Sequence, residues 1–337
     1  MPELPEVETV RRGLNQLTLN QEITGGDVLL DRTLAHPFSV EDFFTGIKGS
    51  VITIWHRRGK YLLAELSLSP SSPRQSPPLR EAAARLQVGK PGRQIPTEGK
   101  RQMLYLGRPQ DRTGSPPAVL APHSAGSSSS TLGVHLRMTG QLLWLHRDEP
   151  LHKHTRVRLF FGDERELRFV DQRTFGQMWW VPPEVAPESI ITGLGKLAVD
   201  PFSAEFSVEY LALKLRNRRR PIKTALLDQS VVAGLGNIYA DEALFLSGIL
   251  PETLCTHLQP EQIERLRSCI IQVLKASIEA GGTTFSNFLN VKGVNGNYGG
   301  VAWVYNRAGE PCRACGRAIQ RTRLAGRSSH YCVQCQR

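Results

Sequence analysis

The sequence has no apolar run that approaches the ~20 residues of a membrane-spanning helix. Its first residues also have neither the basic start nor the apolar stretch of a secretory signal. Cysteine is scarce, with six in 337 residues, and four of the six cluster at the end of the chain. These absences argue against a disulfide-rich scaffold and predict a soluble, cytoplasmic protein. The length allows two or three domains with sizeable cores.

What the chain does have is basic charge. The net charge of +11 and the pI near 9.6 favour a polyanionic partner, with nucleic acid first and an acidic membrane surface second. More than half of the excess comes from residues 69–130, where nine lysines and arginines face three acidic residues. Two further clusters of basic residues lie in residues 214–223 and in the last 33 residues, which hold seven arginines. These local clusters indicate a polyanion more strongly than the overall charge does.

The first six residues, Met-Pro-Glu-Leu-Pro-Glu, allow two interpretations. If Met1 is removed, Pro2 gains a free secondary amine, which can attack a sugar carbon and form an iminium. Glu3 beside it is placed to donate or accept a proton. Proline and glutamate are equally suited to the start of a helix, and apolar residues at spacings of three and four predict a helix over residues 5–17. Taken alone, the six residues favour the helix start.

The next part of the chain predicts β-structure. Residues 51–55 and 61–66 predict a hairpin, and Lys60 lies in its basic turn. Such turns are usually solvated; the alternative is that Lys60 reaches a phosphate or a reacting proton. Short strands over residues 133–144, 155–161, 165–170 and 177–181 then predict a sandwich or a barrel.

Three side chains near turns between these strands have two interpretations. Met138, Arg173 and Phe175 are favoured as ordinary core and surface residues. The alternative is a wedge pushed into a base stack, as apolar side chains do when a protein kinks duplex DNA.

Residues 67–130 differ from the rest in composition. Proline, serine, glycine, arginine and glutamine dominate, which is typical of a linker or a looped-out insertion. Residues 79–88 are compatible with a transient helix. We expect this segment to be a solvated loop that takes no part in the chemistry. The alternative is that its basic residues tether the protein weakly to nucleic acid.

From about residue 200 the sequence predicts helices, over residues 204–216, 223–228, 237–246 and 262–280. Before the third, Gly234 and Gly236 let the backbone approach another chain closely, and Asn237 opens a helix whose N-terminus suits an anion. A helix–turn–helix-like device and a simple helical hairpin both fit this pattern. Residues 287–303 are too rich in glycine and asparagine for a regular element, so they predict a loop that closes on a ligand, or a linker.

The end of the chain carries two Cys-x2-Cys pairs separated by sixteen residues, the spacing of a four-thiolate zinc site. The expected ligands are Cys312, Cys315, Cys332 and Cys335. Two disulfides or free thiols are the alternative. Zinc would close a small hairpin that displays arginines suited to phosphate contact, namely Arg317, Arg321, Arg323 and Arg327. Cys255 and Cys269 fit no such pattern, and we expect them to be buried or incidental.

Read together, these motifs resemble the formamidopyrimidine-DNA glycosylase family. The resemblance lies in Met-Pro-Glu-Leu-Pro-Glu-Val-Glu-Thr, Arg-Gly-Lys-Tyr-Leu-Leu, His-Leu-Arg-Met-Thr-Gly, Gly-Leu-Gly-Asn-Ile-Tyr-Ala-Asp-Glu, Gly-Gly-Thr-Thr and the terminal cysteine pairs. It covers nearly the whole chain except the insertion. Leu4 favours this family over its endonuclease VIII relatives, which usually have glycine there.

The resemblance implies an α+β multidomain fold. Residues 1–200 would form an N-terminal β-sandwich with flanking helices, residues 201–300 a helix–two-turn–helix domain, and residues 301–337 a zinc-finger β-hairpin. The implied activity is base-excision repair. The enzyme would remove oxidised purines such as 8-oxoguanine and formamidopyrimidines from duplex DNA, and cleave the abasic strand by β,δ-elimination. It would act as a bacterial, nucleoid-associated monomer with one structural Zn²⁺ and no membrane partner.

The resemblance also implies roles for single residues. Pro2 would attack C1′ and hold the sugar as a Schiff base, and Glu3 would be its acid–base partner. Lys60 would contact phosphate and assist β-elimination, and Arg327 would contact phosphate and assist δ-elimination. Glu6 would support the active site from the first helical turn.

Further DNA contacts follow from the same resemblance. Asn237 would grip a flanking phosphate, and His154, Arg173 and Arg218 match other contacts. Met138, Arg173 and Phe175 would fill the space left by a flipped nucleotide. The loop over residues 291–300 would close over the everted base.

Two alternatives stand beside this interpretation. One is a glycosylase of the same fold that prefers oxidised pyrimidines. The other is a non-catalytic protein that binds damaged DNA, against which the presence of Pro2, Glu3 and Lys60 argues.

Overall fold

We analysed a computed structural model, which describes residues 1–69, 129–283 and 288–337. The predicted helix over residues 79–88 lies outside the described residues. No helix within the described ranges is long and apolar enough to cross a membrane.

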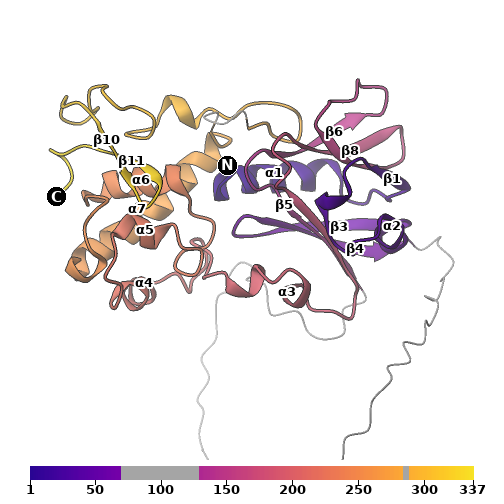
Figure 1. Cartoon of the computed structure of the whole chain (residues 1–337), viewed down its shortest axis with the longest axis horizontal. Coiled ribbons are helices and arrows are strands. Elements are labelled where there is room, and N and C mark those ends of the chain that lie inside the picture. Colours follow the sequence, from indigo (N-terminus) through magenta and orange to yellow (C-terminus); the bar gives the residue numbers. More distant parts are fainter. Residues whose placement is uncertain (70–128, 284–287) are drawn as a thin grey trace, which may run out of the picture. The chain divides into compact units, whose positions relative to one another are not determined.

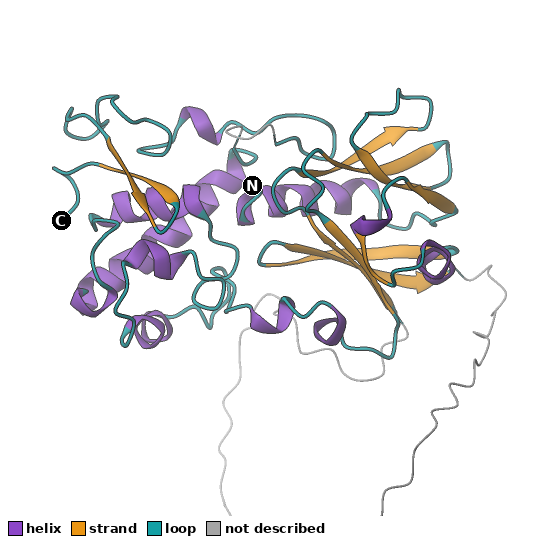
Figure 2. Ribbon diagram, in the orientation of Figure 1, coloured by secondary structure: helices purple, strands orange, loops and turns teal. Residues whose placement is uncertain are grey.

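The first part of the chain forms two β-sheets, drawn in orange in Figure 2. The five-stranded sheet has the order β2 (Leu34–His36), β9 (Gln177–Val181), β5 (Ser130–His135), β4 (Tyr61–Leu68) and β3 (Ser50–Arg58). The four-stranded sheet has the order β1 (Gly25–Val28), β7 (Thr155–Phe160), β8 (Arg165–Asp171) and β6 (Gly140–His146). All neighbouring strands run antiparallel except β2 and β9, which are parallel.

One hydrophobic core joins the two sheets, so the sandwich that the strand pattern predicted is present. Leu132 and Val134 of β5 share this core with Leu167 and Phe169 of β8. The alternation of buried and partly exposed residues along β7 shows the period of two that a half-buried strand requires.

Helix α1 (Leu4–Leu17) closes one side of this core. Its residues Val7, Val10 and Leu14 are fully buried there, which confirms the helix predicted over residues 5–17. The short helices α2 (Val40–Ile47) and α3 (Pro187–Ile190) also belong to this part of the chain.

The insertion falls between two paired strands. Strand β4 ends at Leu68, β5 begins at Ser130, and Leu66 lies opposite Ser130 in the antiparallel register. The two ends of the insertion therefore leave the sheet next to each other.

A second core is built from helices. It is formed by α4 (Val208–Leu215), α5 (Ile222–Leu226), α6 (Asn237–Ser247) and α7 (Pro260–Glu279). Helix α4 begins later than predicted because the Ser207 side chain accepts a hydrogen bond from the Tyr210 N–H and caps the helix there. Helix α6 ends as predicted, at Gly248 in the left-handed region with φ 71°.

The chain ends in a two-stranded hairpin, β10 (Gln320–Leu324) and β11 (Arg327–Tyr331). Strand β11 lies against α6 (Figure 1). The hairpin has its own small core, in which Phe245 of α6 packs with Val304, Ile319 and two of the terminal cysteines.

Candidate active site

The start of the chain is buried between α1 and the glycine turn that precedes α6. Pro2 and Glu3 are both buried, and the Leu4 N–H donates to the Gly234 carbonyl at 3.0 Å. A Cβ on Gly236 would lie 2.2 Å from Cδ of Glu3, and Gly234 adopts φ +84° with Leu4 close by. The close approach predicted from the two glycines therefore occurs, and the approaching chain is the protein's own N-terminus.

The Glu3 carboxylate lies on the N-terminus of α6. Its Oε1 accepts the Ile238 N–H at 3.0 Å and its Oε2 is 3.5 Å from the Tyr239 N. The anion predicted at this helix start is thus the Glu3 side chain, held by the first free amides of the helix. Burial raises the pKa of Glu3, while Lys60 and these amides oppose the rise. A carboxyl group with such a pKa can carry a proton and give it away.

Glu6 supports this arrangement from the first turn of α1. Its Oε2 accepts the Glu3 N–H at 2.8 Å, and its Oε1 accepts the Tyr239 hydroxyl and the Thr283 N–H. Burial raises the pKa of Glu6 to about 7, and the charge of Glu3 adds to the rise. The bond to the Glu3 N–H is also half of a helix capping box, so the helix-start interpretation holds together with the site interpretation.

Sequence reasoning missed the second layer of this network. Tyr239 receives a hydrogen bond from Ser277 of α7 while it donates to Glu6. The signal in the sequence was weak, because each residue is a single polar group on an otherwise apolar helix face.

Lys60 lies in the turn between β3 and β4 and is only 7% exposed. The expectation of a solvated turn is therefore wrong for this residue. The reason is Gly59, whose φ of +57° tucks the turn against Gly234, with 3.4 Å between its would-be Cβ and the Gly234 N. Among the described residues Lys60 forms no ion pair, and burial lowers its pKa, with Glu3 and Glu6 opposing this and Arg327 adding to it.

The α-amine at the start of the chain belongs to the same group. In this structure the amine is that of Met1, one residue ahead of the Pro2 nitrogen. Burial lowers its pKa, Glu3 and Glu6 raise it, and Lys60 and Arg173 lower it further. A half-buried amine, two carboxyl groups and a buried lysine therefore come together here, within electrostatic range of Arg173 and Arg327.

Two turns of the sandwich carry the predicted wedge residues, and Asp171 ties the turns together. Its carboxylate accepts the Thr139 hydroxyl and, at 2.7 Å, the Gly176 N–H. Phe175 is 53% exposed, with the Arg173 guanidinium 5.2 Å from its ring centre. Met138, on the other turn, is half-buried.

The core interpretation is therefore wrong for Phe175. The place beneath the turn is already filled by Phe169, which would lie 2.4 Å from a Cβ on Gly176. The Phe175 ring therefore lies at the surface, where the Arg173 guanidinium packs over it.

The remaining predicted contacts lie on other elements. His154 is the last residue of the β6–β7 loop, and the Arg156 guanidinium lies 3.2 Å from its Nδ1. Arg218 precedes α5 and donates to Asp228 at 3.0 Å. Asn237 begins α6, and its side chain reaches Ser328 of β11 at 3.4 Å. Only Asn237 is adjacent to the group around Glu3.

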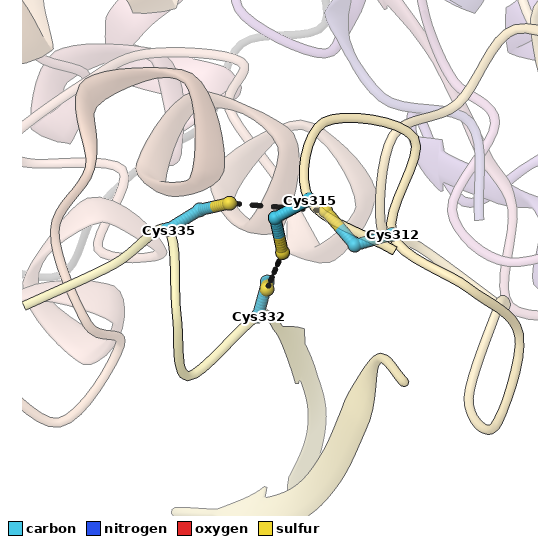
Figure 3. Close-up of side chains that lie close together, drawn as sticks. All are labelled: Cys312, Cys315, Cys332 and Cys335. Carbon is cyan, nitrogen blue, oxygen red and sulfur yellow. Dashed lines mark hydrogen bonds between the residues drawn. The ribbon is translucent and has the colours of Figure 1, made fainter. Parts of the chain in front are cut away.

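The four terminal cysteines form a site that fits zinc. Their Sγ atoms lie within 4.8 Å of one another, and the side chains converge from two knuckles in Figure 3. Cys312 and Cys335 are 3.8 Å apart at sulfur, and Cys315 and Cys332 are 3.5 Å apart. Tetrahedral zinc with Zn–S bonds of about 2.3 Å sets its sulfurs ~3.8 Å apart. No disulfide joins the four cysteines, and their clustered sulfurs fit a zinc site rather than disulfides or unliganded thiols.

The hairpin between the knuckles exposes its arginines as predicted, namely Arg317, Arg321, Arg323 and Arg327. Cys255 and Cys269 are buried away from the zinc site, as expected.

Comparisons with known proteins agree with this arrangement. Three family models match the chain: the formamidopyrimidine-DNA glycosylase N-terminal domain over residues 1–178, its H2TH domain over residues 197–288, and the zinc finger found in FPG and IleRS over residues 309–337. A formamidopyrimidine-DNA glycosylase of Nostoc punctiforme is 69% identical over 100% of this chain and 96% of the relative. One of Trichodesmium erythraeum is 55% identical over 100% of both chains.

Solved structures give the same result. The Lactococcus lactis Fpg in complex with DNA that contains an abasic site has a TM-score of 0.75 and 28% identity, over 99% of each chain. The MutM (Fpg) protein of Thermus thermophilus has a TM-score of 0.73 and 30% identity, over 99% of this chain and 98% of the other.

The fold and the site are those of a DNA glycosylase of base excision repair that carries a structural zinc finger. Within that class, the chain belongs to the formamidopyrimidine-DNA glycosylase family.

Proposed function

We propose that the protein removes oxidised purines, such as 8-oxoguanine and formamidopyrimidines, from duplex DNA and then cleaves the abasic strand through a Schiff base on Pro2. The observation that carries this proposal is the burial of the chain start within one group of Glu3, Glu6 and Lys60. A lowered pKa favours the neutral form of an amine, which is the nucleophilic form. Removal of Met1 gives Pro2 that amine.

In the first step the Pro2 nitrogen attacks C1′ of the damaged nucleoside and the glycosidic bond breaks. Glu3, whose pKa is raised, gives its proton to the departing base or to the sugar ring oxygen, and the proton that the Pro2 nitrogen loses goes to the other of these two atoms. The sugar ring opens, and C1′ remains bound to Pro2 as an iminium. The amides of Ile238 and Tyr239 then stabilise the carboxylate that results.

In the second step the iminium makes the C2′ proton acidic. Its removal breaks the bond from C3′ to the 3′-phosphate, which is β-elimination, and a further elimination breaks the bond to the 5′-phosphate. Lys60, whose charge acts on the amine, and Arg327, whose charge acts on Lys60, are cations that suit these two departing phosphates. Water finally releases the sugar fragment from Pro2.

The surrounding residues suit binding of a bent duplex with one nucleotide flipped out. Met138, Arg173 and Phe175 would enter the gap and offset the few kcal/mol that unstacking costs. Asn237, His154, Arg218 and the hairpin arginines would contact phosphates, as would be expected for a protein bound to DNA like the Lactococcus lactis relative.

The proposal extends to the organisation of the molecule. We place domain boundaries near residues 200 and 300, and expect a monomer that acts on nucleoid DNA in a bacterial cytoplasm.

Strand cleavage tests the substrate class. A duplex with one 8-oxoguanine and a matched duplex with one thymine glycol are incubated with protein that lacks Met1, under single-turnover conditions. We expect faster cleavage of the 8-oxoguanine duplex, ending in β,δ-products. Faster cleavage of thymine glycol would identify the oxidised-pyrimidine enzyme instead. Binding without cleavage of either duplex would identify the non-catalytic alternative.

Retention of Met1 is the matched control, since it changes only the amine. Protein with intact Met1 is expected to bind the duplex without cleaving it, because the Pro2 nitrogen is then an amide.

A further inference from the structure

A buried cluster of charged residues joins α5 and α6 to β11. Lys223, Asp241 and His330 are 1%, 0% and 4% exposed. The Lys223 Nζ lies 2.6 Å from Asp241 Oδ1, and the other carboxylate oxygen accepts the His330 N–H at 2.9 Å. A buried carboxylate without such partners would be strongly unfavourable, so the three residues act as a unit.

The cluster holds the backbone of β11 at two points. Lys223 donates to the Ser328 carbonyl, and Asp241 binds the amide of His330. One edge of β11 pairs with β10. The hydrogen bonds with Lys223 and Asp241 provide partners for backbone groups of β11 on its side towards α6. Arg327 is the first residue of β11 and directly precedes Ser328.

The same helix holds Glu3. The Ile238 amide binds the Glu3 carboxylate, and Asp241 follows three residues later, close to one helical turn. Helix α6 therefore carries, on successive turns, the contact that fixes Glu3 and the contact that fixes the strand of Arg327. The charges of Glu3 and Arg327 both act on Lys223 at the centre of the cluster.

We propose that Asp241 is a positioning residue. It fixes where β11 lies along α6, and thereby fixes the position of Arg327 relative to Glu3 and Lys60. It acts through Lys223 and the backbone of β11, without touching DNA. This inference rests on the proposed role of Arg327 in the elimination that breaks the 5′-phosphate bond. Loss of the register then changes which eliminations are completed, while attack by Pro2 continues.

The double variant Lys223→Met, Asp241→Leu tests this proposal. It removes both charges with side chains of similar volume, so no unpaired charge is left buried in a folded protein. Zinc content and the unfolding transition establish that the variant is folded. The Asp148→Asn variant is the matched control, because Asp148 forms an exposed pair with His146 far along the chain.

Two measurements decide the outcome. On a duplex with a preformed abasic site, the ratio of β- to β,δ-product is expected to rise at least ~10-fold, towards that of Arg327→Ala, with the yield of borohydride-trapped adduct retained. Hydrogen exchange of the Ser328 and His330 amides is expected to become faster. The Asp148→Asn variant is expected to match the wild type in both.

A product ratio equal to that of the wild type in folded, zinc-loaded double variant would overturn the proposal, as would unchanged exchange of the β11 amides. An equal loss of adduct and of both products would assign the cluster a purely structural role. A wild-type protein that cleaves no strand would refute the proposed function, and the exchange measurement would still decide whether Asp241 fixes β11.

Discussion

Glu6 shows what burial does to a single residue at this site. Its pKa is raised from 4.5 to about 7, so the folded protein binds a proton at this carboxyl more tightly than the unfolded chain does. The free energy of unfolding should therefore fall as the pH rises from about 4.5 to about 7, and level off above. A shift of this size corresponds to roughly 3 kcal/mol.

The Glu6→Gln variant has no proton to lose at this position. We expect its free energy of unfolding to fall less between pH 5 and pH 8 than that of the wild type, by a large part of that amount. Urea denaturation at the two pH values measures the difference. The same fall in both proteins would show that Glu6 does not carry the titration.

At the scale of single residues, the sequence predicted which residues belong to the site better than it predicted how buried they are. Pro2, Glu3, Lys60 and the cysteines were recognised as chemical groups, and the structure brings the first three together. The burial of Lys60 was not predicted, because it depends on a contact between two glycine turns some 170 positions apart in the sequence. The core interpretation of Phe175 failed for the same kind of reason, since Phe169 had already filled the core.

Among the elements, α6 has the largest share of the contacts that build the site. Its first turn binds Glu3, its Tyr239 binds Glu6, and Asp241 binds β11. Glu242 accepts the amides of residues 303–305 at 2.8 to 2.9 Å. The helix periodicity predicted its extent, but the sequence did not show that this helix binds segments from three other parts of the chain.

The glycine before α6 permits this arrangement, and Gly236→Ala tests it. Gly236 has φ −137° and ψ −163°, which alanine also adopts, so the expected effect is purely steric. Its Cβ would lie 2.2 Å from Cδ of Glu3. We expect a loss of about 1–3 kcal/mol in the free energy of unfolding and a larger loss of base excision than of DNA binding.

Gly162→Ala is the matched control, since nothing lies within 4 Å of its Cβ position. Its free energy of unfolding should stay within about 0.5 kcal/mol of the wild type. Gly236→Ala protein with normal stability and normal excision would contradict the close approach of Glu3 to the glycine turn.

At the scale of the whole molecule, the insertion only connects two paired strands, so it can be removed without removing the residues of the site. Its ends leave paired strands, with Leu66 opposite Ser130, so an Asn-Gly linker can replace residues 70–128 and leave a short hairpin loop. We expect the shortened protein to retain its zinc and to cleave a short 8-oxoguanine duplex within about twofold of the full chain. A weaker dependence of DNA binding on salt would reveal the electrostatic tether. A folded, zinc-loaded protein without cleavage would contradict the view that the insertion has no chemistry.

The sandwich, the helical part and the zinc hairpin were each predictable from local patterns, because strand alternation, helix periodicity and cysteine spacing are local signals. What joins them was not, because it consists of single contacts such as Leu4 to Gly234 and Asp241 to His330. The active site lies at these joins.

The central claim is that Pro2 is the nucleophile, and mapping the trapped adduct tests it most directly. Protein is reduced with borohydride on an 8-oxoguanine duplex, digested with trypsin and sequenced by mass spectrometry. We expect the sugar fragment on the Pro2 nitrogen of the peptide that spans residues 2–11. An adduct on Lys60, or on a chain that still begins with Met1, would contradict the claim.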